Sequence, residues 1–223
     1  LASTDLGPAG SAFGLALGGR VALAAKVSGA WDALAGTVSL DAANLRLPGE
    51  VRVASAQARF AVGAGADAAA NGRLAIRSVA LRGAAKPVVE EATLAIAGTR
   101  GRHEARLEAR LADGNAVRAL LDGGLAAGDR LPEWRGRVEA LELTGQAAFA
   151  LAAPAPLLVS AGRVELGEAL LGGEPGEIRL QQTRWTPAGF ETRGSSSAVV
   201  VRTIQQLLGL QGAMGSNLVL VGE

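Results

Sequence analysis

The chain has 223 residues, with 22 Lys and Arg against 21 Asp and Glu, and it contains no Cys and no Tyr. The lack of Cys excludes disulfides and thiol chemistry, and the interspersed charges form no basic stripe along the sequence, which argues against nucleic-acid binding. Hydrophobic residues make up 49% of the chain and aromatic residues only 3%. Such a composition favours an elongated sheet, or a cavity lined by small aliphatic groups, over a thick and closely packed core.

The N-terminus, LASTDLGPAG, has neither an initiator Met nor the layout of a signal peptide. No apolar run is long enough to span a bilayer. We therefore interpret 1–223 as a single continuous segment of a longer protein, with a possible subdivision near 122–133.

A recurring triplet opens many of the predicted strands: a Gly, a charged residue and a β-favouring aliphatic residue. It occurs at Gly19-Arg20-Val21, at Gly72-Arg73-Leu74 and at four other places with irregular spacing. Apolar and polar residues then alternate, as on a strand with one buried and one wet face. One-faced alternation favours antiparallel pairing. The sequence therefore predicts an all-β fold, an elongated antiparallel sheet.

The alternation changes phase at two places. In VRVASAQARFAV it slips near Ala54-Ser55, and in RVEALELTG it slips near Ala140-Leu141. An extra residue in a strand produces such a slip, so we expect β-bulges there.

In the stretch RGRHEARLEARLADG, residue propensity and hydrophobic pattern predict different structures. Glu, Ala, Arg and Leu are all strong helix formers. On a helix, like-charged residues would lie four apart, which is mildly destabilising. On a strand, Glu104, Arg106, Glu108 and Arg110 fall on one face and Ala105, Leu107, Ala109 and Leu111 on the other. We predict a half-buried strand.

One segment, SSSAVVVRTIQQLLG, has a helical period. Its apolar residues Val200, Ile204, Leu207 and Leu208 are spaced i, i+4, i+7 and i+8. Ser195 or Ser196 is suited to cap the N-terminus, and a Gly follows the last apolar residue. The pattern predicts one short amphipathic helix near 196–208.

No set of residues points to catalysis, to a cofactor or to a metal, so we predict that the protein is not an enzyme. His103 is the only His, without metal-spaced partners, and we interpret it as a solvated turn residue. GSSSA lacks the G-x-S-x-G order, and GAGADAAANG lacks the spacings of phosphate loops. Glu90 and Glu91 fall on opposite faces of a strand, which excludes an acid/base pair.

Three Trp, at positions 31, 134 and 185, lie beside turn signals. We interpret them as side chains that close the ends or edges of a sheet, with gating or lipid contact as the alternative role.

The C-terminal half contains a series of motifs in a characteristic order. A Trp-Arg-Gly strand (134–136) and an ELTG strand end (142–145) precede the double run LAAPAPLLVSAGRVELG. A WTPAGF…RG strand pair (185–194), the amphipathic helix and the closing GSNLVLVGE follow. In this order the motifs resemble the TamB (translocation and assembly module) family, in the AsmA-like group of Gram-negative envelope proteins. The upstream stretches LRLPGEVRVASAQARFAV and EEATLAIAGTRGRHEARLEARLADG are similar in kind.

The resemblance implies a periplasmic segment of a protein anchored in the inner membrane, with a β body curled into a taco-like hydrophobic groove. It implies that the groove conducts phospholipid between the inner and outer membranes and supports outer-membrane protein assembly (protein secretion) with a BamA/TamA-type partner. The composition agrees, because a sheet with one aliphatic face must hide that face from water. The residues expected to line the groove are Val21, Leu23, Val27, Val38, Leu40, Leu74, Ile76, Leu94, Ile96, Leu107, Leu111, Val164, Leu166, Ile178 and Leu180.

Two other functions fit the same pattern. The chain could be a structural β-sandwich or solenoid that acts as a spacer or an adhesin-like passenger. It could also be a scaffold that presents sheet edges to an assembly partner. An apolar channel that holds lipid would favour the groove, whereas a dry, filled interior would favour the spacer.

Overall fold

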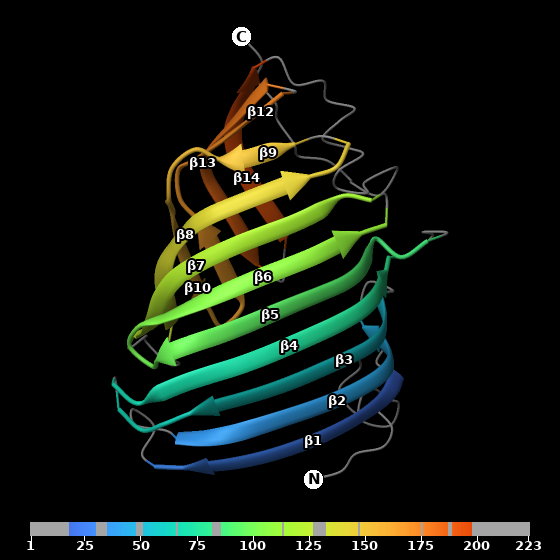
Figure 1. Cartoon of the computed structure of the whole chain (residues 1–223), viewed down its shortest axis with the longest axis vertical. Helices are drawn as coiled ribbons and strands as arrows, with labels where there is room; N and C mark the ends of the chain where they lie inside the picture. The colour runs from blue at the N-terminus through green and yellow to red at the C-terminus, as the bar shows by residue number, and fades with distance from the viewer. Residues whose placement is uncertain are drawn as a thin grey trace. The chain divides into compact units, whose positions relative to one another are not determined.

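The computed structural model describes residues 18–29, 35–47, 51–65, 67–81, 86–112, 114–126, 133–146, 148–174, 176–186 and 189–197. These residues form fourteen β-strands and no helix, and the strands pair antiparallel, which confirms the predicted all-β, antiparallel class. They divide into two compact units, Leu1–Gly114 and Asn115–Glu223, and each is described by itself. Figure 1 colours the strands of the first unit from blue to yellow-green.

Unit 1 is a meander in which each strand pairs with the next one along the chain. Within the unit, the substantial contacts of each described strand are with its neighbours in the sheet, so these strands form a single layer. The six strands are β1 (Gly18–Ser28), β2 (Ala35–Leu47), β3 (Val51–Val62), β4 (Ala69–Ala80), β5 (Val89–Thr99) and β6 (His103–Leu111).

Unit 2 contains β7 (Ala116–Ala126), β8 (Glu133–Thr144), β9 (Phe149–Leu151), β10 (Ala155–Ser160), β11 (Arg163–Leu166), β12 (Ala169–Gly173), β13 (Gly176–Thr186) and β14 (Gly189–Ser197). It is also a meander, but two of its strands are broken. β9 and β10 both pair with β8, so they are two parts of one strand interrupted at 152–154, where Pro154 has no N–H for a ladder bond. β11 and β12 both pair with β13 and are likewise two parts of one strand.

A line of irregular backbone crosses unit 1. Asn44 on β2 and Ser78 on β4 have φ of 51° and 53°, and the registers place Ala54 of β3 between them. Val53 and Ala56 are both buried in one cluster, which confirms the predicted change of phase near Ala54-Ser55. The predicted bulge in β3 is wrong, because its pairings continue without a register shift. The left-handed residues on the flanking strands mark the change instead.

The second predicted slip is a true bulge. The pairing of β7 with β8 shifts between Leu120 and Leu121, which pair with Ala140 and Val138. Glu139 is therefore the extra residue, one position before the predicted Ala140-Leu141.

The charged stretch 103–111 is a strand, β6, and its burial alternates as predicted. Most of the predicted helix and the predicted closing strand GSNLVLVGE lie outside the described residues. Ser195 and Ser196 are strand residues of β14, paired with Arg179 and Ile178, so they do not cap a helix.

Candidate functional site

One face of unit 1 is apolar from its first strand to its last. Directly paired residues on neighbouring strands point to the same face of a sheet, so the registers show which side chains lie together. One row crosses all six strands and contains Leu23, Leu40, Ala58, Leu74, Leu94 and Leu107. The rows on either side of it are Ala25, Val38, Phe60, Gly72, Ile96 and Ala105, and Val21, Ala42, Ala56, Ile76, Ala92 and Ala109. We call these rows the apolar face.

The apolar face continues across the line of irregular backbone. Beyond it lies a row of larger aliphatic side chains: Leu45, Val53, Val79, Val89 and Leu111. Leu45, Val53 and Val79 contact the same hydrophobic cluster as Ala42 and Ala56. The registers therefore bring together on one face all the groove residues that the sequence predicted in unit 1, from Val21 to Leu111.

No second layer covers the apolar face within the described part of unit 1. The Leu, Ile and Val side chains of β2–β6 on this face are half-buried or, for Val53, buried, and on β1 Leu23 and Val27 are 43% and 61% exposed. The buried members are chiefly alanines, such as Ala42, Ala58 and Ala105 at 6–7% exposure. Larger neighbours in the same layer shield these small side chains, so their burial needs no second layer from the described part of unit 1.

Aromatic side chains cover bare backbone on both units. The ring of Phe60 lies over Gly72 on the neighbouring strand, where an added Cβ would collide with it. In unit 2 the indole of Trp134 lies over the facing pair Gly123 and Gly136 in the same way. Trp134 is the second residue of β8, and its indole covers the bare backbone of the neighbouring pair on one face of the sheet. Phe60 was missed, although the phase change near Ala54 places it in register with Val38.

The four predicted groove residues of unit 2 lie on its last strands. Val164 pairs with Val159 and with Trp185, and Leu166 pairs with Leu157. Ile178 and Leu180 pair with Leu171 and Ala169 of β12. Trp185 pairs with Phe190, and these two side chains are 49% and 54% exposed. Trp31 lies outside the described residues.

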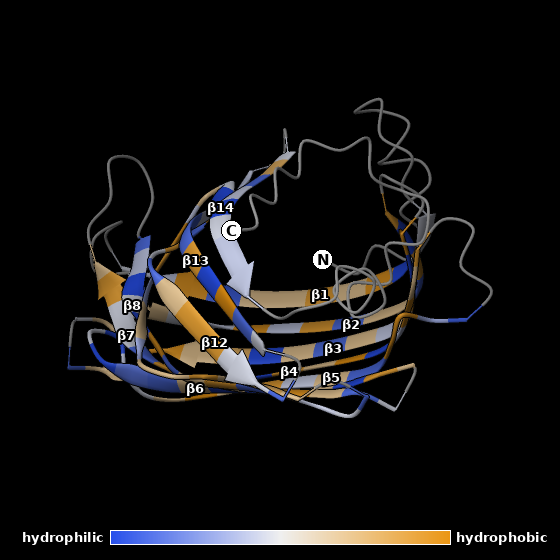
Figure 2. Cartoon of the chain, turned by 90° about the horizontal axis from the view of Figure 1, so that it is seen from above, coloured by the Kyte–Doolittle hydropathy of each residue, from blue (hydrophilic) through white to orange (hydrophobic). Residues whose placement is uncertain are grey.

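The opposite face of unit 1 carries its charges. Figure 2 shows hydrophobic and hydrophilic residues alternating along the strands. On β5 and β6 the charges pair: Glu91 contacts Arg110 at 2.6 Å and Arg77 at 3.5 Å, and Glu104 contacts Arg106 at 2.7 Å. Because these pairs are largely exposed, each contributes at most about 1 kcal/mol to stability.

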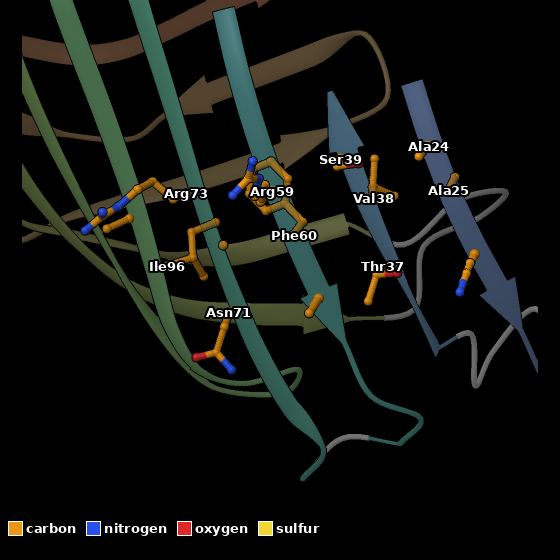
Figure 3. A pocket seen from close by; sticks show the side chains of 14 residues that line it. Ala24, Ala25, Thr37, Val38, Ser39, Arg59, Phe60, Asn71, Arg73 and Ile96 are labelled. Carbon is orange, nitrogen blue, oxygen red and sulfur yellow. The ribbon is translucent and has the colours of Figure 1, made fainter. Parts of the chain in front are cut away.

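An open pocket of about 840 Å³ lies over β1–β5, where each strand contributes two or three successive residues. Figure 3 shows it from close by, with Val38, Phe60 and Ile96 among the apolar lining and Arg59 and Arg73 among the cationic lining. Successive residues point to opposite faces of a strand, so residues of one face contribute side chains to the lining and those of the other contribute backbone atoms. No Asp or Glu lines it.

The prediction that His103 is a solvated turn residue is wrong. It is the first residue of β6, only 6% exposed, and its Nδ1 donates a hydrogen bond to the carbonyl oxygen of Thr99 at 2.9 Å. It pairs with Gly98, whose φ of 141° and missing side chain allow the close approach of the two backbones.

Among the described residues, no group of three His, Cys, Asp or Glu side chains could hold a metal ion. The described part of the chain also has no helix long and apolar enough to cross a membrane. The predictions that the protein has no enzymatic activity and no cofactor stay predictions.

The described residues define an all-β, antiparallel protein, and the sheet of unit 1 has one apolar and one charged face. No family model, no curated protein and no solved structure matches this chain.

Proposed function

We propose that the apolar face of unit 1 binds the acyl chains of phospholipids and guides them from strand to strand. The observation that carries the proposal is the row Leu23, Leu40, Ala58, Leu74, Leu94 and Leu107, which crosses six strands on one uncovered face. Exposure of such a face to water is unfavourable in free energy, and an apolar ligand that covers the face removes this cost. Acyl chains are the apolar ligands that fit a long surface without specific polar contacts.

The chemistry of the lining suits movement as well as binding. Each methylene removed from water contributes about 0.8 kcal/mol, whichever aliphatic side chain it touches. Successive strands present similar Leu, Ile, Val and Ala side chains at a spacing of about 4.8 Å. An acyl chain that shifts by one strand therefore exchanges one set of contacts for an equivalent set, and its free energy changes little.

The sequence resemblance supports the wider setting of this proposal. We propose that the chain is a periplasmic segment of an inner-membrane-anchored envelope protein that conducts phospholipid between the two membranes. In this setting a BamA/TamA-type partner binds the protein at the outer membrane and links lipid transport to outer-membrane protein assembly. A curled, taco-like arrangement of the sheet would shield the acyl chains from water on their free side.

The decisive test is site-specific photocrosslinking at Leu107 and at its neighbour Glu108. Leu107 pairs with Leu94 on the apolar face and Glu108 pairs with Thr93 on the other face, so adjacent positions on one strand probe opposite sides. We expect adducts on phospholipid acyl chains at Leu107 and none on acyl chains at Glu108, measured by mass spectrometry after irradiation in lipid-containing cell envelopes.

Equal labelling at Leu107 and Glu108 would contradict the proposal. The absence of lipid at both positions, with protein adducts on the apolar face instead, would favour the spacer or the edge-presenting scaffold.

A further inference from the structure

Strand pairing gathers positive charge on one face of β1–β4 that is not evident along the sequence. The four strands carry seven cationic side chains and one carboxylate, Asp41. The registers and the change of phase at Asn44 and Ser78 place all seven on the face opposite the apolar face. The cations are Arg20, Lys26, Arg46, Arg52, Arg59, Arg73 and Arg77, and all are exposed. We call this surface the basic face.

Two pairs of arginines on the basic face are directly opposed across neighbouring strands. Arg46 pairs with Arg52, and Arg59 pairs with Arg73. Like charges in this position destabilise a sheet, since their Cβ atoms are only about 5 Å apart. Of the seven cations, only Arg77 has a carboxylate within 4.0 Å in the described structure. A local conflict of this kind is typical of a binding site, where a ligand supplies the missing countercharge.

The surroundings of Arg59 and Arg73 are those of an anion site. Ser39 pairs directly with Arg59, and Asn71 lies two residues before Arg73 on the same face. Lys26 pairs with Thr37 on the same face, and the two rows that contain Thr37 and Ser39 hold no acidic residue across β1–β4. Two opposed guanidinium groups with hydroxyl and amide groups beside them match the oxygens of a phosphate.

We propose that the basic face is a docking surface for the phosphate head groups of an anionic lipid layer, with the Arg59–Arg73 pair as its strongest contact. The choice of a lipid layer rests on the proposed function, in which the other face of the same strands carries acyl chains. A nucleic acid is the other phosphate-rich partner, but its recognition in single strands depends on aromatic stacking. The only described aromatic residue of unit 1, Phe60, belongs to the apolar face. Docking through this face would hold unit 1 against a membrane surface and leave its apolar face free for lipid.

The test measures binding of the 223-residue chain to vesicles by flotation. The vesicles contain either phosphatidylcholine alone or phosphatidylcholine and phosphatidylglycerol in equal parts. We expect binding to the anionic vesicles only, weakened by added salt, because the attraction is electrostatic. The variant R59Q/R73Q is expected to lose about tenfold or more in affinity.

The matched control is R106Q/R110Q, which removes the same charge from the same face. These two arginines pair with Glu104 and Glu91, so we expect less than about threefold loss. Equal losses in both double variants would overturn the proposal, since net charge alone would then govern binding. If R59Q/R73Q fails to fold by circular dichroism, R46Q/R52Q applies the same test to the other opposed pair.

Two further arms separate the sources of phosphate. Inorganic phosphate that displaces the vesicles at constant ionic strength would show a site for the free ion and overturn a lipid-layer site. If polyuridine binds more tightly than the vesicles and this binding is lost in R59Q/R73Q, the lipid-layer site is overturned in favour of an RNA site.

Crosslinking of lipid at Leu107 is expected to persist in R59Q/R73Q. If the chain with both arginines forms no lipid adducts at Leu107 but still binds the vesicles, the proposed function alone is overturned.

Discussion

Small residues determine how side chains pack on the faces of this sheet. Alanines such as Ala42 and Ala58 are buried although no second layer lies over them within unit 1, because larger side chains on the adjacent strands enclose them. Glycines accept the ring of Phe60 and the indole of Trp134. These packing relations lie within one layer of the sheet and involve only neighbouring strands.

The substitution Gly136→Ala tests this packing. The new methyl group would collide with the backbone of Asp122 and with the Trp134 indole. Overpacking of this kind is expected to lower the free energy of unfolding by about 1–3 kcal/mol, measured by urea denaturation followed through tryptophan fluorescence.

Gly172→Ala is the matched control, because nothing lies within 4 Å of an added Cβ there. We expect it to be neutral or to stabilise by up to about 1 kcal/mol, since Ala restricts the unfolded chain more than Gly. Equal destabilisation by the two substitutions would contradict the close packing around Gly136.

For the secondary-structure elements, the period of the apolar residues predicts the structure better than helix propensity does. β6 is built from helix-forming residues, yet its two-residue period makes it a strand with Leu107 on one face and Glu108 on the other. The same reasoning is incomplete where the phase changes. The sequence shows a slip in β3, but the left-handed Asn44 and Ser78 that accompany it lie on other strands.

Substitutions at adjacent positions on β5 test whether acyl chains bind only to the apolar face. Leu94→Asp places a carboxylate in the middle of the apolar face, between Leu74 and Leu107. A buried charge near an acyl chain is costly, so we expect at least about tenfold weaker binding of a fluorescent fatty acid, measured by titration.

Ala95→Asp places the same charge on the other face, between Arg73 and Arg106. There it gains cationic neighbours, and we expect acyl binding to stay unchanged. A comparable loss of binding in Ala95→Asp would mean that the fatty acid does not distinguish the two faces.

For the whole molecule, the described residues form two units, and unit 1 combines an apolar face with a basic face. A folded chain with an uncovered apolar face gains stability from any ligand that covers it. At a ligand concentration about 100 times the Kd, the gain is about 2.7 kcal/mol. For a chain of this length that corresponds to a rise in Tm of about 5 °C or more.

Scanning calorimetry with lysophosphatidylglycerol below its micellar concentration measures this rise. We expect the rise in the unmodified chain and a much smaller one in Leu94→Asp. An unchanged Tm throughout the titration would argue that the apolar face is covered by the protein itself.

The sequence alone determined the properties that depend on near neighbours along the chain. The two-residue period gives the strand class and assigns side chains to a face within each run of unbroken phase, and from it the groove residues between Val21 and Leu111 were predicted. Only the tertiary structure determined which distant residues meet. Arg59 and Arg73 face each other because β3 and β4 pair in one register, and a shift by a single residue would separate them. The burial of His103 against Gly98 likewise depends on the pairing of two strands. Such contacts depend on register, which the summed fit of whole strands decides rather than any local pattern.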